Sequence, residues 1–357
     1  MPETIRQILP QLYHSILPPF FDGAAPNEVK APCGSCTMCP PEGRPADPGV
    51  VYFRPDSKCC TYHPNLPNYL VGAILKDTSP DLAEGRRRIR DKITKRIGVT
   101  PRWVAAPKKY SLLLDASRES SFGRSAALRC PYYEEQGGLC TIWKHREADC
   151  STFFCKHVGG ADGQIFWRDL DTYLRCAERK LSGHAVLRVA SGLTEPAGRA
   201  NELTLEELED RAPEALRYTS FWREWEGREE AFYEACHDCI AALSRDDFDR
   251  ILAGDDHDRN VTALEKSYRR ITAPELPERL VLNPTMSLQP AQDGVLATTY
   301  SRYEPVMLTT TLHEVLGEFS SRETVAEVKE RVAREHDITI PDAMLLELYQ
   351  LRVVVSA

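Results

Sequence analysis

The spacing of apolar side chains predicts that helices dominate the first 275 residues. Apolar residues recur at intervals of three and four positions, which places them on one face of a helix. The predicted helices are a short one within residues 1–30 and longer ones over 67–77, 79–98, 163–181 and 204–244. The apolar stripe of the first helix comprises Ile5, Ile8, Leu9, Leu12 and Ile16.

The helix predicted over residues 79–98 has a basic outer face, spelled RRRIRDKITKR. Ser79 provides its N-cap and Pro80 its first helical position, both of which are typical start signals. Ile89 and Ile93 lie on the opposite, apolar face. Two interpretations of the basic face remain open, namely a solvated surface or a docking site for an acidic partner.

The pattern changes after about residue 275. Short strands joined by an Asp–Gly turn are predicted first, followed by three helices and a closing strand. These elements cover residues 279–300, 308–320, 324–336, 341–351 and 352–355. Their order is that of a winged-helix-like module. We therefore expect two domains, residues 1–275 and 276–357.

A stretch rich in proline, glycine and cysteine covers residues 31–65 and predicts loops and turns. Loops suit a metal site, because several ligands must converge without the constraint of a regular element. The expected fold is thus α+β, with a loop-rich cysteine segment packed on a mainly α-helical domain and a separate C-terminal module.

The composition is that of an ordinary folded protein, with 357 residues of which 42% are hydrophobic and 27% charged. No run approaches the ~18 apolar residues of a membrane span. The N-terminal segment also lacks the features of a secretory leader. We therefore expect a cytoplasmic protein without a membrane partner. The net charge of −8 argues against a general affinity for nucleic acid.

Cysteines are concentrated in the first half of the chain, and this distribution changes the picture. Nine of the twelve cysteines precede residue 156. Thiols in a reducing compartment bind metals more readily than they form disulfides. The expected metal ligands are Cys33, Cys36, Cys39, Cys59, Cys60, Cys130, Cys140, Cys150 and Cys155. Cys176, Cys236 and Cys239 are expected to be unliganded.

The first three cysteines follow the spacing C-x2-C-x2-C, which favours an iron–sulfur cluster. Zinc usually takes two separated pairs of thiolates, whereas a 4Fe–4S cluster presents a separate iron to each thiolate and uses this spacing in ferredoxins. Here Pro40 follows the third cysteine instead of the fourth. Eight thiols would complete two four-thiolate sites, or one cluster and one zinc. Separation along the chain does not decide which cysteines share a site.

Four further polar residues lie close to these cysteines in the sequence: His63, His145, Arg146 and His157. The histidines could complete a coordination shell, or donate hydrogen bonds to sulfur. Arg146 could offset the negative charge of a thiolate cluster, or cap a helix.

At these residues the sequence resembles the CxxCxxCC zinc- or iron-chelating proteins, often called YkgJ-like. The likeness lies in CGSCTMC, KCCTYHP, CPYY, GLCTIW and READCSTFFC, and it covers roughly residues 31–160. In one departure from the family pattern, 19 residues separate Cys39 from the double cysteine. Either Cys59 or Cys60 could therefore be the ligand. The resemblance implies bound iron or zinc, and flagellin lysine-N-methylases are usually grouped in the same family.

The C-terminal segment resembles the PqqD-like domains that bind precursor peptides. Such a domain adds an extended peptide to the edge of its sheet. Winged helices also bind DNA, but seven Lys and Arg against eleven Asp and Glu from residue 279 onward disfavour that alternative. A purely structural module is the third possibility.

Two functional hypotheses follow. In the first, an iron–sulfur protein carries out redox or group-transfer chemistry, such as methyl transfer, on a peptide or protein held by residues 276–357. In the second, zinc or iron only organises the loop-rich segment. The catalytic residues are not predicted by either hypothesis.

Overall fold

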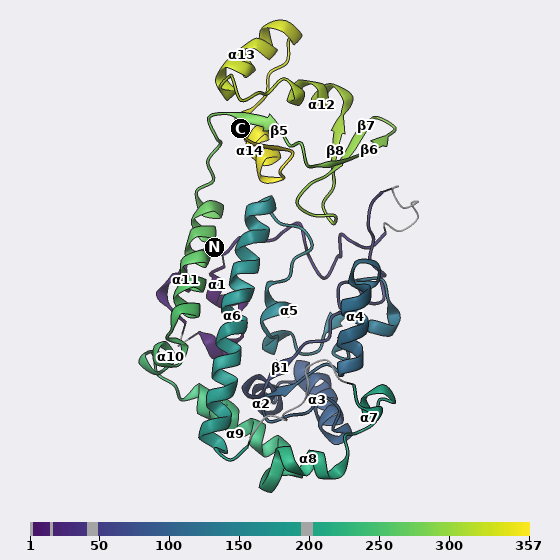
Figure 1. The fold of residues 1–357 in the computed structure, drawn as a ribbon, viewed down its shortest axis with the longest axis vertical. Helices are drawn as coiled ribbons and strands as arrows, with labels where there is room; N and C mark the ends of the chain where they lie inside the picture. The colour runs from purple at the N-terminus through teal and green to yellow at the C-terminus, as the bar shows by residue number, and fades with distance from the viewer. Residues whose placement is uncertain (1–2, 15–16, 41–48, 194–202) are drawn as a thin grey trace. The chain divides into compact units, whose positions relative to one another are not determined.

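The computed structural model describes residues 3–14, 17–40, 49–193 and 203–357. Ile16, which we expected on the first apolar stripe, lies outside the described residues. Helices make up most of the regular structure and small antiparallel sheets accompany them, as Figure 1 shows. This mixture is that of an α+β protein.

The elements are mostly short, with α6 the longest. The α-helices are α1 (Ile5–Ile8), α2 (Asn68–Lys76), α3 (Ala83–Lys95), α4 (Lys108–Ser121), α5 (Ala148–Thr152), α6 (Gly160–Val189), α7 (Leu205–Leu208), α8 (Ala215–Trp222), α9 (Glu229–Ala241), α10 (Arg245–Leu252), α11 (Asp255–Thr272), α12 (Thr310–Gly317), α13 (Val325–His336) and α14 (Asp342–Gln350). The strands are β1 (Leu66–Pro67), β2 (Trp103–Val104), β3 (Tyr133–Glu134), β4 (Leu139–Cys140), β5 (Leu280–Leu282), β6 (Ser287–Ala291), β7 (Gly294–Thr298), β8 (Val306–Thr309) and β9 (Val354–Ser356).

The chain divides into two compact units, each assembled from segments that are distant in sequence. Unit 1 comprises Met1–Ala25, Phe53–Phe153 and Asp171–Asn260. Unit 2 comprises Pro26–Tyr52, Phe154–Leu170 and Val261–Ala357. The candidate cysteines are therefore distributed over both units. The domain boundary at residues 275 and 276 stays a prediction.

Helix α2 packs along α9 in the core of unit 1. Gly72 lies where the two helices cross, and a Cβ atom at this position would come within 2.0 Å of the Tyr233 carbonyl oxygen. Tyr69, Leu70 and Ile74 on α2 are fully buried. The prediction of a helix after Pro67 is thus confirmed, and its apolar face forms the centre of unit 1.

The short helix predicted within residues 1–30 is correct only over one turn, α1. Two 3-10 segments, Gln11–Tyr13 and Pro19–Asp22, follow it. Pro10 and Pro18 precede these segments, and proline cannot donate the backbone hydrogen bond that would continue an α-helix. Of the expected apolar stripe, Ile5 and Leu9 are buried, whereas Ile8 and Leu12 are only partly buried.

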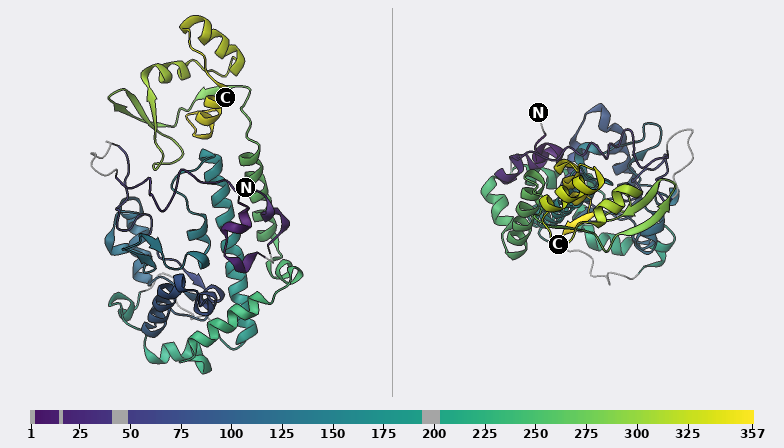
Figure 2. Two further views of the ribbon diagram at one scale, coloured as in Figure 1. Left: turned by 180° about the vertical axis from the view of Figure 1, so that it is seen from behind. Right: turned by 90° about the horizontal axis from the view of Figure 1, so that it is seen from above.

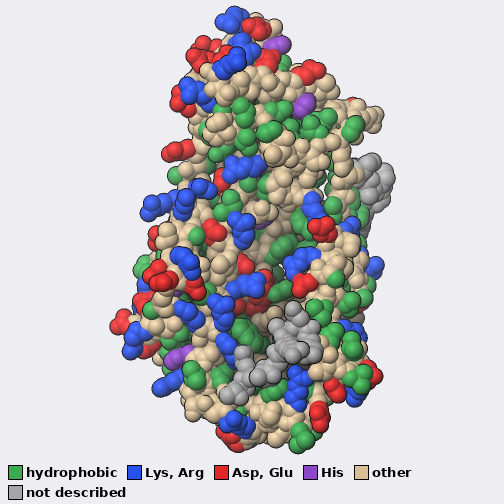
Figure 3. All heavy atoms as spheres, in the orientation of Figure 1, with side chains coloured by type: hydrophobic (Ala, Val, Ile, Leu, Met, Phe, Trp, Pro, Cys, Tyr) green, Lys and Arg blue, Asp and Glu red, His purple; other side chains and the backbone are tan. Residues whose placement is uncertain are grey.

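Helix α3 confirms the start signals expected at Ser79 and Pro80, which open a 3-10 turn that continues into α3. Its basic face is paired with acidic side chains. Arg87 and Arg88 bond Glu84 within the helix, while Arg90 reaches Glu230. On the face of the molecule drawn in Figure 3, basic and acidic side chains are interspersed.

The single helical stretch predicted over residues 204–244 is wrong, because the structure divides it into α7, α8 and α9. Pro213 lies between α7 and α8, and Gly227 precedes α9 with a φ of +80°. Helix α8 itself ends at Trp222, because the next residue, Arg223, has a positive φ of +46° that turns the chain out of the helix. Helices α4, α10 and α11 were not predicted.

The C-terminal part of unit 2 contains the predicted order of strands and helices, with one addition. Strands β6, β7 and β8 form an antiparallel sheet, and β5 pairs with β9. Figure 2 shows this sheet and helices α12, α13 and α14 from two further sides. Strand β8 replaces the first residues of the helix predicted at 308–320. The β6–β7 turn lies one residue earlier than expected, since Ala291 already pairs with Gly294.

These elements enclose a core of their own within unit 2. Its fully buried residues include Leu308 on β8, Leu316 on α12, Val328 and Val332 on α13, and Leu345 on α14.

In the part of the chain that the structure describes, no helix combines the length and apolar character needed to cross a membrane.

Candidate metal centre

Cys130, Cys140 and Cys150 lie near one another in unit 1, although they come from a turn, a strand and a short helix. Burial raises the pKa of the Cys130 thiol to about 12, and the neighbouring Cys140 adds to the rise. Burial also raises the pKa of Cys150 well above its usual range, with contributions from Glu147, Cys130 and Cys140. Because thiolates repel one another, a metal cation would be needed for all three to ionise here.

Backbone hydrogen bonds hold Cys130 and Cys140 in place. The amide nitrogen of Cys130 donates to the carbonyl oxygen of Cys60, 2.8 Å away. Cys140 is on β4 and pairs with Tyr133 of β3. The turn between the strands contains Gly138 with a φ of +62°, a conformation that glycine adopts without strain. This hairpin folds Cys140 back toward Cys130.

Two buried carboxyl groups hold the start of α5, which carries Cys150. Glu147 is the N-cap, and its Oε1 atom accepts a 3.0 Å hydrogen bond from the Cys150 amide. Oε1 of Glu178 accepts a 2.9 Å bond from the Ala148 amide. Burial raises the pKa of Glu147 to about 8, and the neighbouring Asp149 adds to the rise. The position of Cys150 therefore depends on Glu147 and Glu178, two acids that the cysteine motifs did not predict as site residues.

The hydrogen bonds described for Arg146 and His145 go to carbonyl oxygens and a carboxylate, and not to thiols. Arg146 donates a 3.0 Å bond to the carbonyl oxygen of Trp143 and another to that of Cys150. Nε2 of His145 lies 3.0 Å from Oδ2 of Asp77. Arg146 thus fastens the two ends of the segment that leads into Cys150.

A cationic side chain, Lys92 on α3, lies close to Cys130. Its Nζ atom donates hydrogen bonds to Nε2 of His63 at 2.9 Å and to the carbonyl oxygen of Ala105 at 2.6 Å. Burial lowers the pKa of Lys92 to about 7, while the Cys130 thiolate acts in the opposite direction. Burial and Lys92 together hold the pKa of His63 well below its usual value. Ionised thiolates would therefore favour a charged Lys92.

Aromatic rings complete the surroundings of Cys130. The ring of His63 lies 5.3 Å from that of Tyr110 and 6.1 Å from that of Tyr132. Tyr132 is fully buried, and its hydroxyl has no hydrogen-bond partner in the described structure. Cys130 and Cys140 both raise the pKa of Tyr132, after the larger effect of burial. A sulfur atom of a bound metal centre would give this hydroxyl an acceptor.

Lys92 and Tyr132 were not among the site residues predicted from the sequence. Tyr132 is two residues from Cys130 and belongs to the motif CPYY, so its proximity was a usable signal. Lys92 is one of several basic residues on α3. Nothing in its spacing distinguishes it from its exposed neighbours.

Cys59 and Cys60 lie in a run of turns in unit 1. A hydrogen bond between their side chains is the largest cause of the raised pKa of Cys59. The Cys60 amide donates to the Ser57 carbonyl oxygen at 2.9 Å, and Thr61 bonds back to Cys59 at 2.7 Å. The carbonyl oxygen of Cys60 binds Cys130, as described above, so this pair is attached to the thiol cluster through the backbone.

The remaining candidate ligands, Cys33, Cys36, Cys39 and Cys155, lie in unit 2. The first three are on a turn in which the Cys39 amide donates to the Cys36 carbonyl oxygen at 3.1 Å. His157 is also in unit 2 and is 3% exposed. Burial lowers its pKa to about 4.

Cys176, Cys236 and Cys239 are apart from these motifs. Cys236 is fully buried on α9, and Cys176 is buried on α6. Burial raises the pKa of Cys236 well above its usual value, with a further contribution from Cys239. These side chains pack in or beside the helical core of unit 1.

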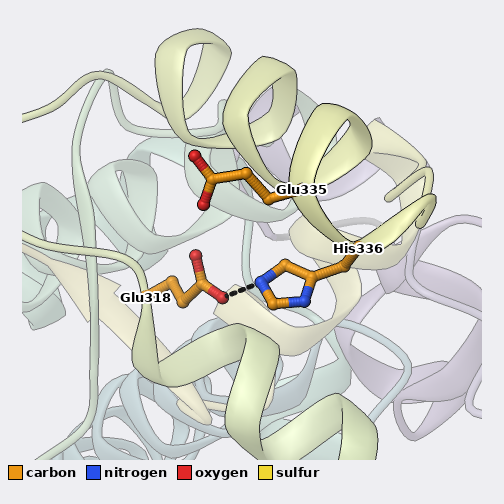
Figure 4. Close-up of side chains that lie close together, drawn as sticks. All are labelled: Glu318, Glu335 and His336. Atoms are coloured by element: carbon orange, nitrogen blue, oxygen red, sulfur yellow. Dashed lines mark ion pairs between the residues drawn. The ribbon is translucent and has the colours of Figure 1, made fainter.

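A different set of potential ligands lies on the C-terminal part of unit 2. Ligand atoms of Glu318, Glu335 and His336 all lie within 4.8 Å of one another, and Figure 4 shows them converging between α12 and α13. However, Nε2 of His336 pairs with Glu318 at 2.6 Å, and Arg331 also pairs with Glu318. The set is therefore an ion-pair network on the surface of the unit.

Comparisons with known proteins identify no relative of this chain. No family model, no curated protein and no solved structure matches it. The function is therefore inferred from the residues and their geometry.

Proposed function

We propose that this chain binds an iron–sulfur cluster through Cys130, Cys140 and Cys150 and uses it for redox or group-transfer chemistry on a peptide or protein. The observation that carries the proposal is that the thiols of Cys130, Cys140 and Cys150, from three separate segments of unit 1, are close enough to interact electrostatically. Cys59 or Cys60 is the candidate fourth ligand, because their segment is bonded to Cys130. The order of the cysteine motifs, which resembles that of the YkgJ-like proteins, supports the same function.

The cysteines of the described residues do not form a preformed zinc site. Two thiolates on one tetrahedral zinc lie about 3.8 Å apart, given a Zn–S distance of about 2.3 Å. Among the described residues, Glu318, Glu335 and His336 are the three whose ligand atoms all lie within 4.8 Å of one another. No three cysteine sulfurs there are as close together. A cubane cluster separates its thiolates more widely, because each binds a different iron. When bound, such a cluster supplies electrons, or an iron to which a substrate can bind.

The residues around Cys130 suit an anionic thiolate centre. Lys92 would offset part of its negative charge from within the protein, where screening by water is weak. The unpartnered hydroxyl of Tyr132 would donate to a sulfur atom. Hydrogen bonds and positive charge near the sulfurs are the means by which a protein tunes the reduction potential of a cluster.

The proposed substrate is a peptide or a protein segment bound by the C-terminal part of unit 2, which we take to be a winged-helix-like, PqqD-like module. Strand β8 is at one edge of the β6–β7–β8 sheet. Met307, the second residue of this strand, is 53% exposed. At the other edge, β6 contains Pro290, which has no amide hydrogen to donate to an added strand. The edge at β8 is therefore the better site for strand addition.

Anaerobic purification followed by iron, sulfide and zinc analysis tests the proposal. We expect brown protein with a broad absorption from sulfur-to-iron charge transfer and a Mössbauer spectrum of a polynuclear cluster. Colourless protein with stoichiometric zinc and no iron would overturn it. That result would support the alternative in which the metal only organises the fold.

A further inference from the structure

The loop that carries Cys33, Cys36 and Cys39 is fastened to the segment that carries Cys155. Glu28, just before the loop, is 7% exposed, and its carboxylate accepts 2.7 Å hydrogen bonds from the Val158 amide and from Nε1 of Trp167. The carbonyl oxygen of the same residue accepts a 2.9 Å bond from the Ala31 amide. One buried carboxylate therefore ties the start of the loop to the chain three residues beyond Cys155.

A second carboxylate makes the same connection from another element of unit 2. Oε1 of Glu304 lies 3.1 Å from Nζ of Lys30, and its Oε2 accepts a 3.4 Å bond from the His157 amide. The carbonyl oxygen of Lys30 in turn accepts a 3.0 Å bond from the Thr37 hydroxyl inside the loop. Glu28 and Glu304 thus hold the three-cysteine turn beside residues 157–158 by contacts that lie wholly within unit 2.

His157 offers a polar atom that lacks a partner at this place. The residue is 3% exposed, and its Nδ1 atom has no hydrogen-bond partner in the described structure. Buried ring nitrogens of histidine are normally hydrogen-bonded, because an unpaired polar atom loses its hydration without compensation. A thiolate or sulfide near Cys155 would accept a hydrogen bond from a protonated Nδ1.

We propose that unit 2 holds a second metal centre, in which Cys33, Cys36, Cys39 and Cys155 bind an iron–sulfur cluster of their own. This inference rests on the proposed function, since it extends iron–sulfur binding from unit 1 to unit 2. Each unit contains enough thiols for a four-thiolate site by itself. Unit 1 contains Cys130, Cys140 and Cys150, together with Cys59 or Cys60. Unit 2 contains the four proposed ligands of the second site.

Iron analysis of two matched triple variants of the full-length chain tests the inference. One variant replaces Cys33, Cys36 and Cys39 with serine, and the other replaces Cys130, Cys140 and Cys150. If both centres are of the 4Fe–4S type, the unsubstituted chain should contain about eight irons and each variant about four. Cys239→Ser, outside both sets, should leave the iron content unchanged.

The possible failures of the two proposals are distinguishable. An unsubstituted chain without iron would end the proposed function itself. If either triple variant loses all its iron while its circular dichroism is unchanged, all the thiols serve one centre and the second centre does not exist. The second centre is also excluded if the variant at Cys33, Cys36 and Cys39 retains all its iron.

If a triple variant fails to fold, the reactivity of the thiols in the unsubstituted chain tests the same inference. The intact iron-loaded protein is treated anaerobically with iodoacetamide, and the modified cysteines are identified by mass spectrometry. Cys33, Cys36, Cys39 and Cys155 should be protected together and become reactive together after oxidative removal of iron. Rapid modification of Cys33 or Cys155 at full iron content would overturn the assignment.

Discussion

Nζ of Lys92 lies 2.9 Å from Nε2 of His63, and burial lowers the pKa values of both groups. A lysine in this position is costly to charge unless an anion is near. The Cys130 thiolate favours the charged form of Lys92. The pair therefore links the basic helix α3 to the candidate metal centre of unit 1.

Lys92→Met is expected to lower the reduction potential of a cluster at Cys130, by tens of millivolts. Removing a nearby positive charge makes it harder to add an electron to an anionic centre. Protein-film voltammetry of the iron-loaded protein measures this potential. Lys95→Met, at an exposed position on the same helix that pairs with Asp91, is the control and should leave the potential unchanged. Equal potentials in all three proteins would show that Lys92 does not act on the centre.

Asp171→Asn is expected to stabilise unit 1 near neutral pH. Burial, with a contribution from Asp149, raises the pKa of Asp171 to about 6 from an ordinary value of 3.8. Between these two values the folded chain holds a proton that the unfolded chain releases, so the free energy of unfolding falls as the pH rises. Well above pH 6, Asp171 is ionised in the folded chain as well, and the buried charge lowers the free energy of unfolding by its full amount. Asparagine would remove a cost of about 1 kcal/mol after allowance for solvent screening.

Urea unfolding of the two proteins at pH 8 and pH 5 measures this effect. The difference in the free energy of unfolding should be largest at pH 8 and should shrink at pH 5, where Asp171 of the parent protein is mostly protonated. Asp246→Asn, at an exposed position, serves as the control. A stability difference that does not change with pH would contradict the prediction.

Gly72→Ala is expected to destabilise the protein by about 2–4 kcal/mol. The added methyl group would meet the Tyr233 carbonyl oxygen at 2.0 Å, so α2 and α9 would have to separate. Gly317→Ala at the end of α12 is the matched control, because no atom lies within 4 Å of a Cβ there. Chemical denaturation compares the two variants. Equal stabilities would mean that the helix crossing adapts without cost.

Met307→Glu is expected to weaken peptide binding at least tenfold if the substrate adds to β8. The side chain is 53% exposed, and a glutamate there would place a charge against the apolar side chains of an added strand. Leu288→Glu, at a 41% exposed position on β6, is the control for the opposite edge. Both variants are probed on an array of immobilised peptides with alternating apolar and polar residues. Equal binding by both would argue against strand addition at β8.

The predictions of secondary structure succeeded where an apolar stripe ran without interruption. The helices expected over 67–77 and 163–181 are present as α2 and as part of α6. The single helix expected over 204–244 is three helices, because the backbone turns through positive φ at Asp210 and at Arg223 although the apolar spacing continues beyond them. Apolar spacing reports which residues are buried, whereas the ends of helices depend on local backbone conformation.

The sequence by itself determined the kind of donor available, since nine thiols in these motifs restrict the candidate metals to those that prefer sulfur. It did not determine which thiols belong together. Only the tertiary structure separated Cys33 and Cys155 from Cys130 and Cys150, and only it placed Lys92 beside the latter group. The physical reason is that turns, a two-stranded hairpin and buried carboxylates set these positions, through contacts between residues far apart in the chain.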